Sequence, residues 1–174
     1  MQYLTRKITT SAMFIALGVL VPLVFHGLGM GSILLPMFWP VAMGAFFLPF
    51  GYALAVGLLT PVLSTLFTGM PPISPPILHV IMIELAALSV TIVILKKTKL
   101  GVFWILLFAL LVSRTFQMIA IYFLLPLFGL PQFLTFAAVL KGGPGIVIML
   151  IMIPFFMHRL KDAEIFTFHP LSRS

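Results

Sequence analysis

The sequence contains very few charged residues and no cysteine. Charged residues make up 7% of the 174 positions, with three acidic side chains among them, whereas 62% of residues are hydrophobic and the mean hydropathy is +1.27. Polar side chains are too scarce to cover a soluble globule, so we predict an integral membrane protein. The absence of cysteine excludes disulfides, thiolate metal sites and a cysteine nucleophile.

The sequence also lacks the motifs of several functional classes. It has no phosphate-binding loop, no His-Glu-x-x-His motif and no paired carboxylates. We therefore expect no enzymatic activity, no metal and no cofactor in this chain, and any ATP hydrolysis must come from other chains. The net charge of +7 does not predict nucleic-acid binding, because the basic residues form short clusters and no continuous stripe.

The apolar stretches predict an all-α membrane protein with six transmembrane helices. Proline, glycine and charged residues delimit the stretches. A span needs about 20 apolar residues. The first stretch is too long for a signal peptide. The second and third are short and close together, so five spans are the alternative. The predicted spans cover residues 8–25, 33–50, 52–67, 75–95, 100–127 and 134–158, in a single domain of residues 1–174.

The basic residues support six spans and give them a direction. They precede the first span, separate the fourth from the fifth and follow the sixth, while the loops on the other side contain no Lys or Arg. With six spans all three clusters lie on one side, which the positive-inside rule identifies as the cytoplasm. Five spans would break this asymmetry. The clusters are Arg6 and Lys7, then Lys96, Lys97 and Lys99, then Arg159, Lys161 and Arg173.

Three ionisable residues, Glu84, Arg114 and Lys141, lie inside the last three spans. A charge in hydrocarbon costs roughly 2.5–3.5 kcal/mol, so such residues usually face a partner, a cavity or a ligand. At about 1.5 Å per residue, all three lie in the outer half of the membrane. If Glu84 pairs with Arg114, Lys141 remains to be balanced by an anionic or strongly hydrogen-bonding ligand, unless it is neutral or reaches the interface.

Further polar and aromatic residues extend this group. Gln117 shares the helix face of Arg114, and His79 lies outward of Glu84 on the same span. Trp39 is either an interfacial anchor or a stacking wall. One interpretation is a structural ion pair with nothing bound. We favour a polar site open to the outside, because a helix register needs fewer polar groups. The candidate substrate-binding residues are Glu84, Arg114, Gln117, Lys141, His79 and Trp39.

Glycine and proline are concentrated in the outer loops and at three points within spans. The loops combine mobile and rigid backbone, which suits lids, although tight connections between helices would look the same. Breaks are expected at Leu35-Pro36, at Pro61 and at Lys141-Gly142-Gly143-Pro144-Gly145. The candidate gating residues are Gly29, Gly31, Pro71, Pro72 and Gly129.

Two pairs of small residues are spaced four apart. Ala12 and Ala16 lie on the first span, and Ala53 and Gly57 lie on the third. Such pairs let helices approach closely, either within the bundle or against another protein. The pattern alone does not distinguish these two uses.

Together these features resemble the substrate-binding S components of energy-coupling factor (ECF) vitamin transporters. The resemblance covers nearly the whole chain and includes the six short spans with cytoplasmic termini. Its most specific segments are Ala12-x-x-x-Ala16, Leu35-Pro36-Met37-Phe38-Trp39-Pro40, Thr60-Pro61 with Gly69-Met70-Pro71-Pro72, Glu84, and the 141–145 segment.

The resemblance implies a subunit of an ABC-type importer in a prokaryotic plasma membrane. It would capture a small water-soluble vitamin or precursor from outside and work with a transmembrane coupling subunit and two cytoplasmic ATPases. Ala12 and Ala16 would dock on the coupling subunit, and the outer loops would close over the ligand. Related sequences often have His where this chain has Phe38, which points to a different substrate.

The identity of the substrate does not follow from the resemblance, because members of one fold bind unrelated molecules. The proline-rich segment most resembles members linked to corrinoid building blocks. The alternative function is a stand-alone carrier that uses Glu84 as its proton-coupled group.

Overall fold

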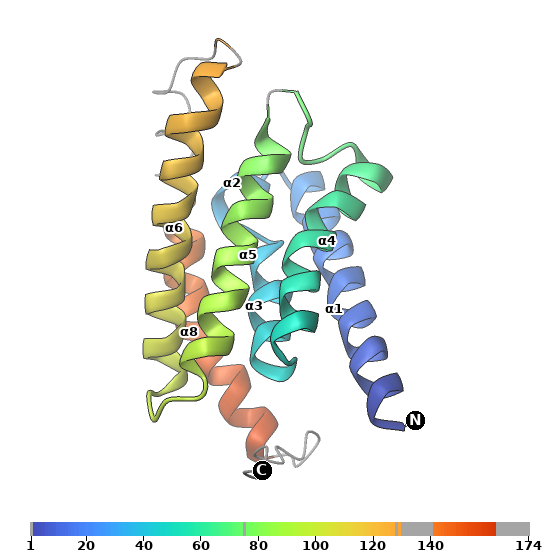
Figure 1. The fold of residues 1–174 in the computed structure, drawn as a ribbon, viewed down its shortest axis with the longest axis vertical. Coiled ribbons are helices and arrows are strands. Elements are labelled where there is room, and N and C mark those ends of the chain that lie inside the picture. Colours follow the sequence, from blue (N-terminus) through green and yellow to red (C-terminus); the bar gives the residue numbers. More distant parts are fainter. Residues whose placement is uncertain (1, 75, 128, 130–140, 163–174) are drawn as a thin grey trace.

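The computed structural model describes residues 2–74, 76–127, 129 and 141–162, and all the regular structure within them is helical. This confirms the predicted all-α fold. Figure 1 shows the helices packed as one elongated bundle. In chain order they are α1 (Gln2–Gly27), α2 (Gly31–Leu34), α3 (Phe38–Phe47), α4 (Phe50–Thr68), α5 (Ile77–Leu95), α6 (Val102–Leu127) and α8 (Gly143–Asp162).

Four helices, α1, α4, α5 and α6, are long and apolar enough to cross a bilayer. They correspond to the predicted first, third, fourth and fifth spans. The shorter α3 and α8 are also apolar. Helix α8 matches the later part of the predicted sixth span, whose residues 134–140 lie outside the described residues.

The predicted second span is not one continuous helix, and that part of the prediction is wrong. Helix α2 ends at Leu34, Leu35 has a left-handed backbone with φ of 50°, and α3 begins only at Phe38. The expected break at Leu35-Pro36 is therefore confirmed. A left-handed residue followed by a proline, which has no N–H to donate, cannot continue a helix. Helix α3 alone is about 15 Å long, half the thickness of a bilayer core.

The expected break at Pro61 is wrong, because α4 runs without interruption past this residue. Proline removes one helical hydrogen bond, yet a buried helix tolerates it when nearby groups are satisfied in other ways. The carbonyl that loses its helical partner is that of Gly57, four residues before the proline. The neighbouring Val56 carbonyl accepts a hydrogen bond of 2.6 Å from the Thr60 hydroxyl. Both Thr60 and Pro61 are buried within the bundle.

Helix α3 lies at the centre of the bundle, in contact with α1, α4, α5 and α8 (Figure 1). Most of its residues are buried, as expected for a helix that is apolar all round. Helices α4, α5 and α6 follow one another as antiparallel neighbours around it. The outer helices expose large apolar side chains, among them Phe67 and Phe123, which suits a surface in contact with lipid.

The close contact between α4 and α5 depends on a small residue. A Cβ added to Gly57 would lie 2.9 Å from the carbonyl oxygen of Leu85 and 2.7 Å from the hydroxyl of Ser89. Ala53 of the same helix is also buried. The pair Ala53 and Gly57 therefore serves packing inside the bundle.

The ends of the helices that carry the basic clusters lie together. The N-terminal end of α1, the C-terminal end of α5 and the C-terminal end of α8 are all at one end of the bundle in Figure 1. Arg6 and Lys7 belong to the first of these ends, Lys96 and Lys97 to the second and Arg159 to the third. This arrangement agrees with an even number of spans between successive basic clusters, as the charge distribution requires.

One of these basic residues, Lys96, donates hydrogen bonds to carbonyls at the C-terminal end of α3. Its ammonium donates to the carbonyl oxygens of Ala45 at 2.8 Å, Phe46 at 3.2 Å and Leu48. The last carbonyls of a helix have no partner within the helix and carry its negative dipole end, so a cation there is stabilising. Burial, with a smaller contribution from the nearby Lys97 charge, lowers the pKa of Lys96 to about 8, so the ammonium form predominates at neutral pH.

We predict that Lys96→Met lowers the stability of the folded protein by about 2 kcal/mol, because hydrogen bonds from a charged donor are lost and carbonyls at the end of α3 are left without a partner. Thermal unfolding in detergent measures the change. Lys97→Met is the matched control, since Lys97 is exposed and its loss should change stability by less than about 0.5 kcal/mol. Equal melting temperatures for the two variants would contradict this role of Lys96.

Candidate functional site

A buried ion pair joins α5 and α6. Nη1 of Arg114 lies 3.0 Å from Oε1 of Glu84, and the two side chains are 14% and 1% exposed. The two helices are antiparallel neighbours, which brings residues far apart in sequence to one level of the bundle. The expected pairing of Glu84 with Arg114 is therefore present.

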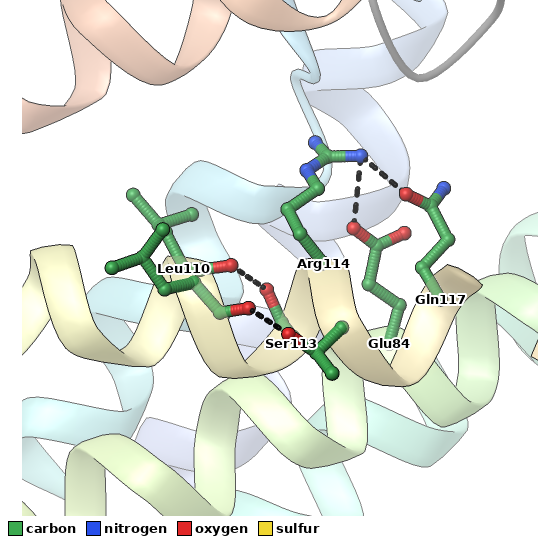
Figure 2. A network of polar contacts seen from close by, with 7 residues as sticks. Glu84, Leu110, Ser113, Arg114 and Gln117 are labelled. Carbon is green, nitrogen blue, oxygen red and sulfur yellow. Dashed lines mark hydrogen bonds and ion pairs between the residues drawn. The ribbon is translucent and has the colours of Figure 1, made fainter. Parts of the chain in front are cut away.

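Gln117 also binds the guanidinium of Arg114. Its Oε1 accepts a hydrogen bond of 2.7 Å from the same Nη1 of Arg114, three residues earlier on α6. Residues at this spacing lie on one face of a helix, as the sequence indicated. Figure 2 shows the Glu84 and Gln117 oxygens converging on one guanidinium nitrogen. The same view includes the bond from the Ser113 hydroxyl to the Leu110 carbonyl, 3.0 Å long, which stays within α6.

Phe38 covers a face of the same guanidinium. The central carbon of the Arg114 guanidinium, Cζ, lies 5.3 Å from the centre of the Phe38 ring, within the range of a cation–π contact. Phe38 is the first residue of α3, directly after the break at Leu35-Pro36. Phe38 thus packs against the buried charge.

The segment before α8 approaches the arginine from another side. A Cβ added to Gly142 would lie 3.4 Å from Nη2 of Arg114 and 3.1 Å from a methyl carbon of Leu35. Gly142 lies in a turn just before α8, whereas residues 143–145 belong to the regular helix, so the irregular backbone expected over residues 141–145 is confined to the start of that segment. Phe38 at the start of α3 and Gly142 before α8 thus come from separate segments and lie next to a single guanidinium.

The hydrogen-bonding capacity of this cluster is only partly used. Among the described residues, Nε and Nη2 of Arg114 are buried and have no hydrogen-bond acceptor, and Oε1 of Glu84 has no well-directed hydrogen bond despite its short contact with Nη1. Buried polar groups are normally satisfied, and each exception needs an explanation. The Glu84–Arg114 pair has no net charge. Nε and Nη2 can therefore donate to a ligand while the arginine keeps its counter-ion.

The other candidate residues are arranged differently. Trp39 is half-buried, and its indole N–H donates to the Leu34 carbonyl at 3.0 Å, across the break between α2 and α3. His79 and Lys141 are exposed. The Lys141 backbone adjoins Gly142 and is therefore close to Arg114, while the ion pair described for Arg114 is with Glu84.

Hydrogen bonds join the loop after α4 to that helix. The hydroxyls of Ser64 and Thr65 each donate at 2.7 Å, to the carbonyls of Met70 and Pro71 respectively. Pro71 is buried and Pro72 is half-buried. These contacts favour a rigid connection over a freely moving lid at this loop.

The other two candidate gating loops contain glycines in special environments. Gly29 and Gly129 have positive φ values of 72° and 66°, a conformation that glycine adopts without strain. Gly31 lies against the ring of His26, because an added Cβ would come within 2.4 Å of that ring. Residue 128 and residues 130–140, which surround Gly129, are outside the described residues.

The small residues of α1 differ from those of α4. Ala12 and Ala16 are both exposed on the outer side of the bundle, whereas Ala53 and Gly57 are buried. The same spacing therefore leaves one face available to another protein and uses the other for internal packing.

Sequence reasoning missed three contributors to this architecture. Phe38 and Gly142 lie in segments that the sequence singles out, but only the fold places them next to Arg114. Lys96 was interpreted solely as part of a cytoplasmic basic cluster. In that cluster nothing distinguishes the lysine that caps α3 from its neighbours.

A bundle of apolar helices with a buried and incompletely satisfied polar cluster is the architecture of a membrane-embedded binding or transport subunit. The chain belongs to the family of substrate-specific components of ECF transporters, since the model of this family matches residues 6–160. Members of this family bind a substrate and are not enzymes, and they generally work with a coupling subunit and ATPases. No curated protein and no solved structure matches the chain.

We predict that Glu84→Gln lowers stability by about 3 kcal/mol, because it leaves the Arg114 charge buried without a counter-ion. Replacing both residues by apolar ones of similar size, Glu84→Leu with Arg114→Met, should restore most of the loss. Thermal unfolding of the two variants in detergent tests this. A double variant that is less stable than Glu84→Gln would contradict the account.

Proposed function

We propose that this substrate-specific component captures a small, water-soluble vitamin or precursor from the outside at the Glu84–Arg114 cluster. The single observation that carries the proposal is the pair of buried Arg114 donors, Nε and Nη2, without an acceptor among the described residues. A purely structural pair would gain stability from satisfying them. The family supports the role of a binding subunit.

The proposed binding residues are centred on Arg114. Glu84 and Gln117 hold its guanidinium through Nη1, and the ring of Phe38 packs against it. Lys141, His79 and Trp39 remain candidates at the border of the site, with the exposed Lys141 able to approach an anionic ligand. A corrinoid precursor is one member of the proposed substrate class.

The proposed topology has six spans, with both termini in the cytoplasm. The common position of the basic helix ends supports it, because cytoplasmic loops carry an excess of Lys and Arg. The short α3 would cross together with α2 and the irregular segment between them, which is possible where such backbone is buried in protein. The outside is then the end of the bundle that carries the α4–α5 connection.

The proposed partners are a transmembrane coupling subunit and two cytoplasmic ATPases. The exposed pair Ala12 and Ala16 supports docking of α1, because two small side chains on one face let another helix approach closely. The stand-alone proton-coupled carrier is not favoured, because the family consists of subunits that bind substrate for a larger assembly.

We predict that the purified chain binds its substrate without accumulating it. Reconstituted alone in liposomes with a proton gradient, it should show no uptake, and accumulation should require the coupling subunit, the ATPases and ATP. Radiolabelled uptake with and without these partners measures the difference. Accumulation by the chain alone, driven by the gradient and abolished in Glu84→Gln, would instead identify a carrier.

We also predict that Ala12→Trp or Ala16→Trp abolishes uptake by the full complex but leaves substrate affinity unchanged, because the bulky ring keeps the partner helix away. Leu17→Trp is the control, since Leu17 is also exposed but lies about 100° further round α1 than Ala16. Uptake assays and binding titrations on the same preparations separate the two effects. Loss of binding in the alanine variants would argue against docking.

A further inference from the structure

Among the described residues, the guanidinium of Arg114 makes its polar contacts through one nitrogen and packs against one aromatic ring. Nη1 contacts Glu84 and Gln117, and the ring of Phe38 lies 5.3 Å from Cζ. The other two nitrogens, Nε and Nη2, are buried and have no acceptor among the described residues. In Figure 2 they point away from the Glu84 and Gln117 oxygens. We refer to Nε and Nη2 together as the free edge of Arg114.

The free edge has a defined chemical preference. Within the plane of a guanidinium, the Nε–H bond and one Nη2–H bond are parallel, and together they match the two oxygens of a carboxylate or phosphate. Nη1, which serves the protein, lies outside this pair. Glu84 therefore neutralises and orients the arginine without using the edge that is best suited to bidentate recognition.

The free edge is bordered by a residue without a side chain. Gly142 approaches Nη2 so closely that an added Cβ would be 3.4 Å away from it. The next residue, Gly143, is different, because a Cβ there would meet nothing within 4 Å. Neither glycine has a positive φ. A methyl group at position 142 would contact Nη2 of Arg114 and would require a small shift of the Leu35 methyl carbons, which it would meet at 3.1 and 3.2 Å, whereas at position 143 it would contact nothing.

We propose that the free edge of Arg114 binds a carboxylate group of the captured molecule, in the plane of the guanidinium and beside Gly142. This inference rests on the proposed function, since it specifies the substrate class of the same site. The charges favour a carboxylate over a phosphate. The Glu84–Arg114 pair is neutral, so a monoanion adds one charge, which the adjacent Lys141 can offset, whereas a dianion adds two in a medium of low dielectric.

Matched pairs of compounds test the chemical class with the wild-type protein. The probes are nicotinate and nicotinamide, pantothenate and pantothenol, biotin and biotinamide, pyridoxal phosphate and pyridoxal, and any small molecule that mass spectrometry finds in the purified protein. Binding is measured by titration calorimetry in detergent. We expect an acid to bind, and its neutral counterpart to bind about tenfold or more weakly, because a charge-assisted bidentate contact is lost.

Two glycine variants then test the position of the contact. Gly142→Ala should weaken binding of that acid about tenfold or more, because its methyl group would occupy space beside Nη2 that the carboxylate needs. Gly143→Ala should change it less than about twofold. Both leave the contact between Glu84 and Arg114 intact, so their melting temperatures without ligand serve as the check on folding.

Each contrary outcome has a distinct meaning. Equal binding of an acid and its neutral counterpart, or equal effects of the two glycine variants, would overturn the inference and leave the proposed function standing; the free edge would then be satisfied by water or by the chain itself. Preference for the phosphate ester would overturn the carboxylate class. If no probe binds and no small molecule co-purifies, the proposed function fails and this inference fails with it.

Discussion

The contact between Glu84 and Arg114 is the interaction on which the rest of the arrangement depends. It lies between two apolar helices, where Glu84 is 1% and Arg114 14% exposed, so each charge is stabilised mainly by the other. The pair therefore fixes the relative position of α5 and α6. It also fixes the orientation of a guanidinium whose remaining contacts come from α3 and from the turn before α8. Four segments of the chain thus converge on one side chain.

The short helix α3 provides the wall against which this cluster is built, and its two ends are satisfied in different ways. At its start, the left-handed Leu35 and Pro36 interrupt the chain. The N–H of Phe38 donates to the Leu35 carbonyl at 2.9 Å, and the Trp39 indole N–H donates to the Leu34 carbonyl across the break. At its end, the Lys96 ammonium reaches across from α5 to the terminal carbonyls. A helix of about 15 Å can remain buried in a bundle because both its ends find polar partners within the protein.

The hydropathy pattern predicted the long helices, since an apolar stretch has few alternatives in a membrane. Opposite charges in two neighbouring spans likewise made a Glu84–Arg114 pair one of the alternatives, and the structure contains it. Tertiary detail was less accessible. Pro61 looked like a helix break, yet α4 continues through it. Nothing local in the sequence places Phe38 over Arg114 or Lys96 at the end of α3, because both contacts join residues tens of positions apart. The spacing of Ala12 and Ala16 equals that of Ala53 and Gly57, and only the fold separates an exposed pair from a buried one.

Stability and binding make opposite demands on the Arg114 cluster, and the distribution of its contacts reconciles them. A pair that served architecture alone would be most stable with every donor satisfied, since each unsatisfied buried donor costs about 1–3 kcal/mol. Arg114 instead has its charge compensated, its position held by Gln117 and Phe38, and its best recognition edge bordered by a glycine. The structural requirement is met through Nη1 alone. The cost of leaving Nε and Nη2 without a protein partner is then recovered whenever an acceptor from outside occupies them, which makes the same arginine a support of the bundle and a contact for a ligand.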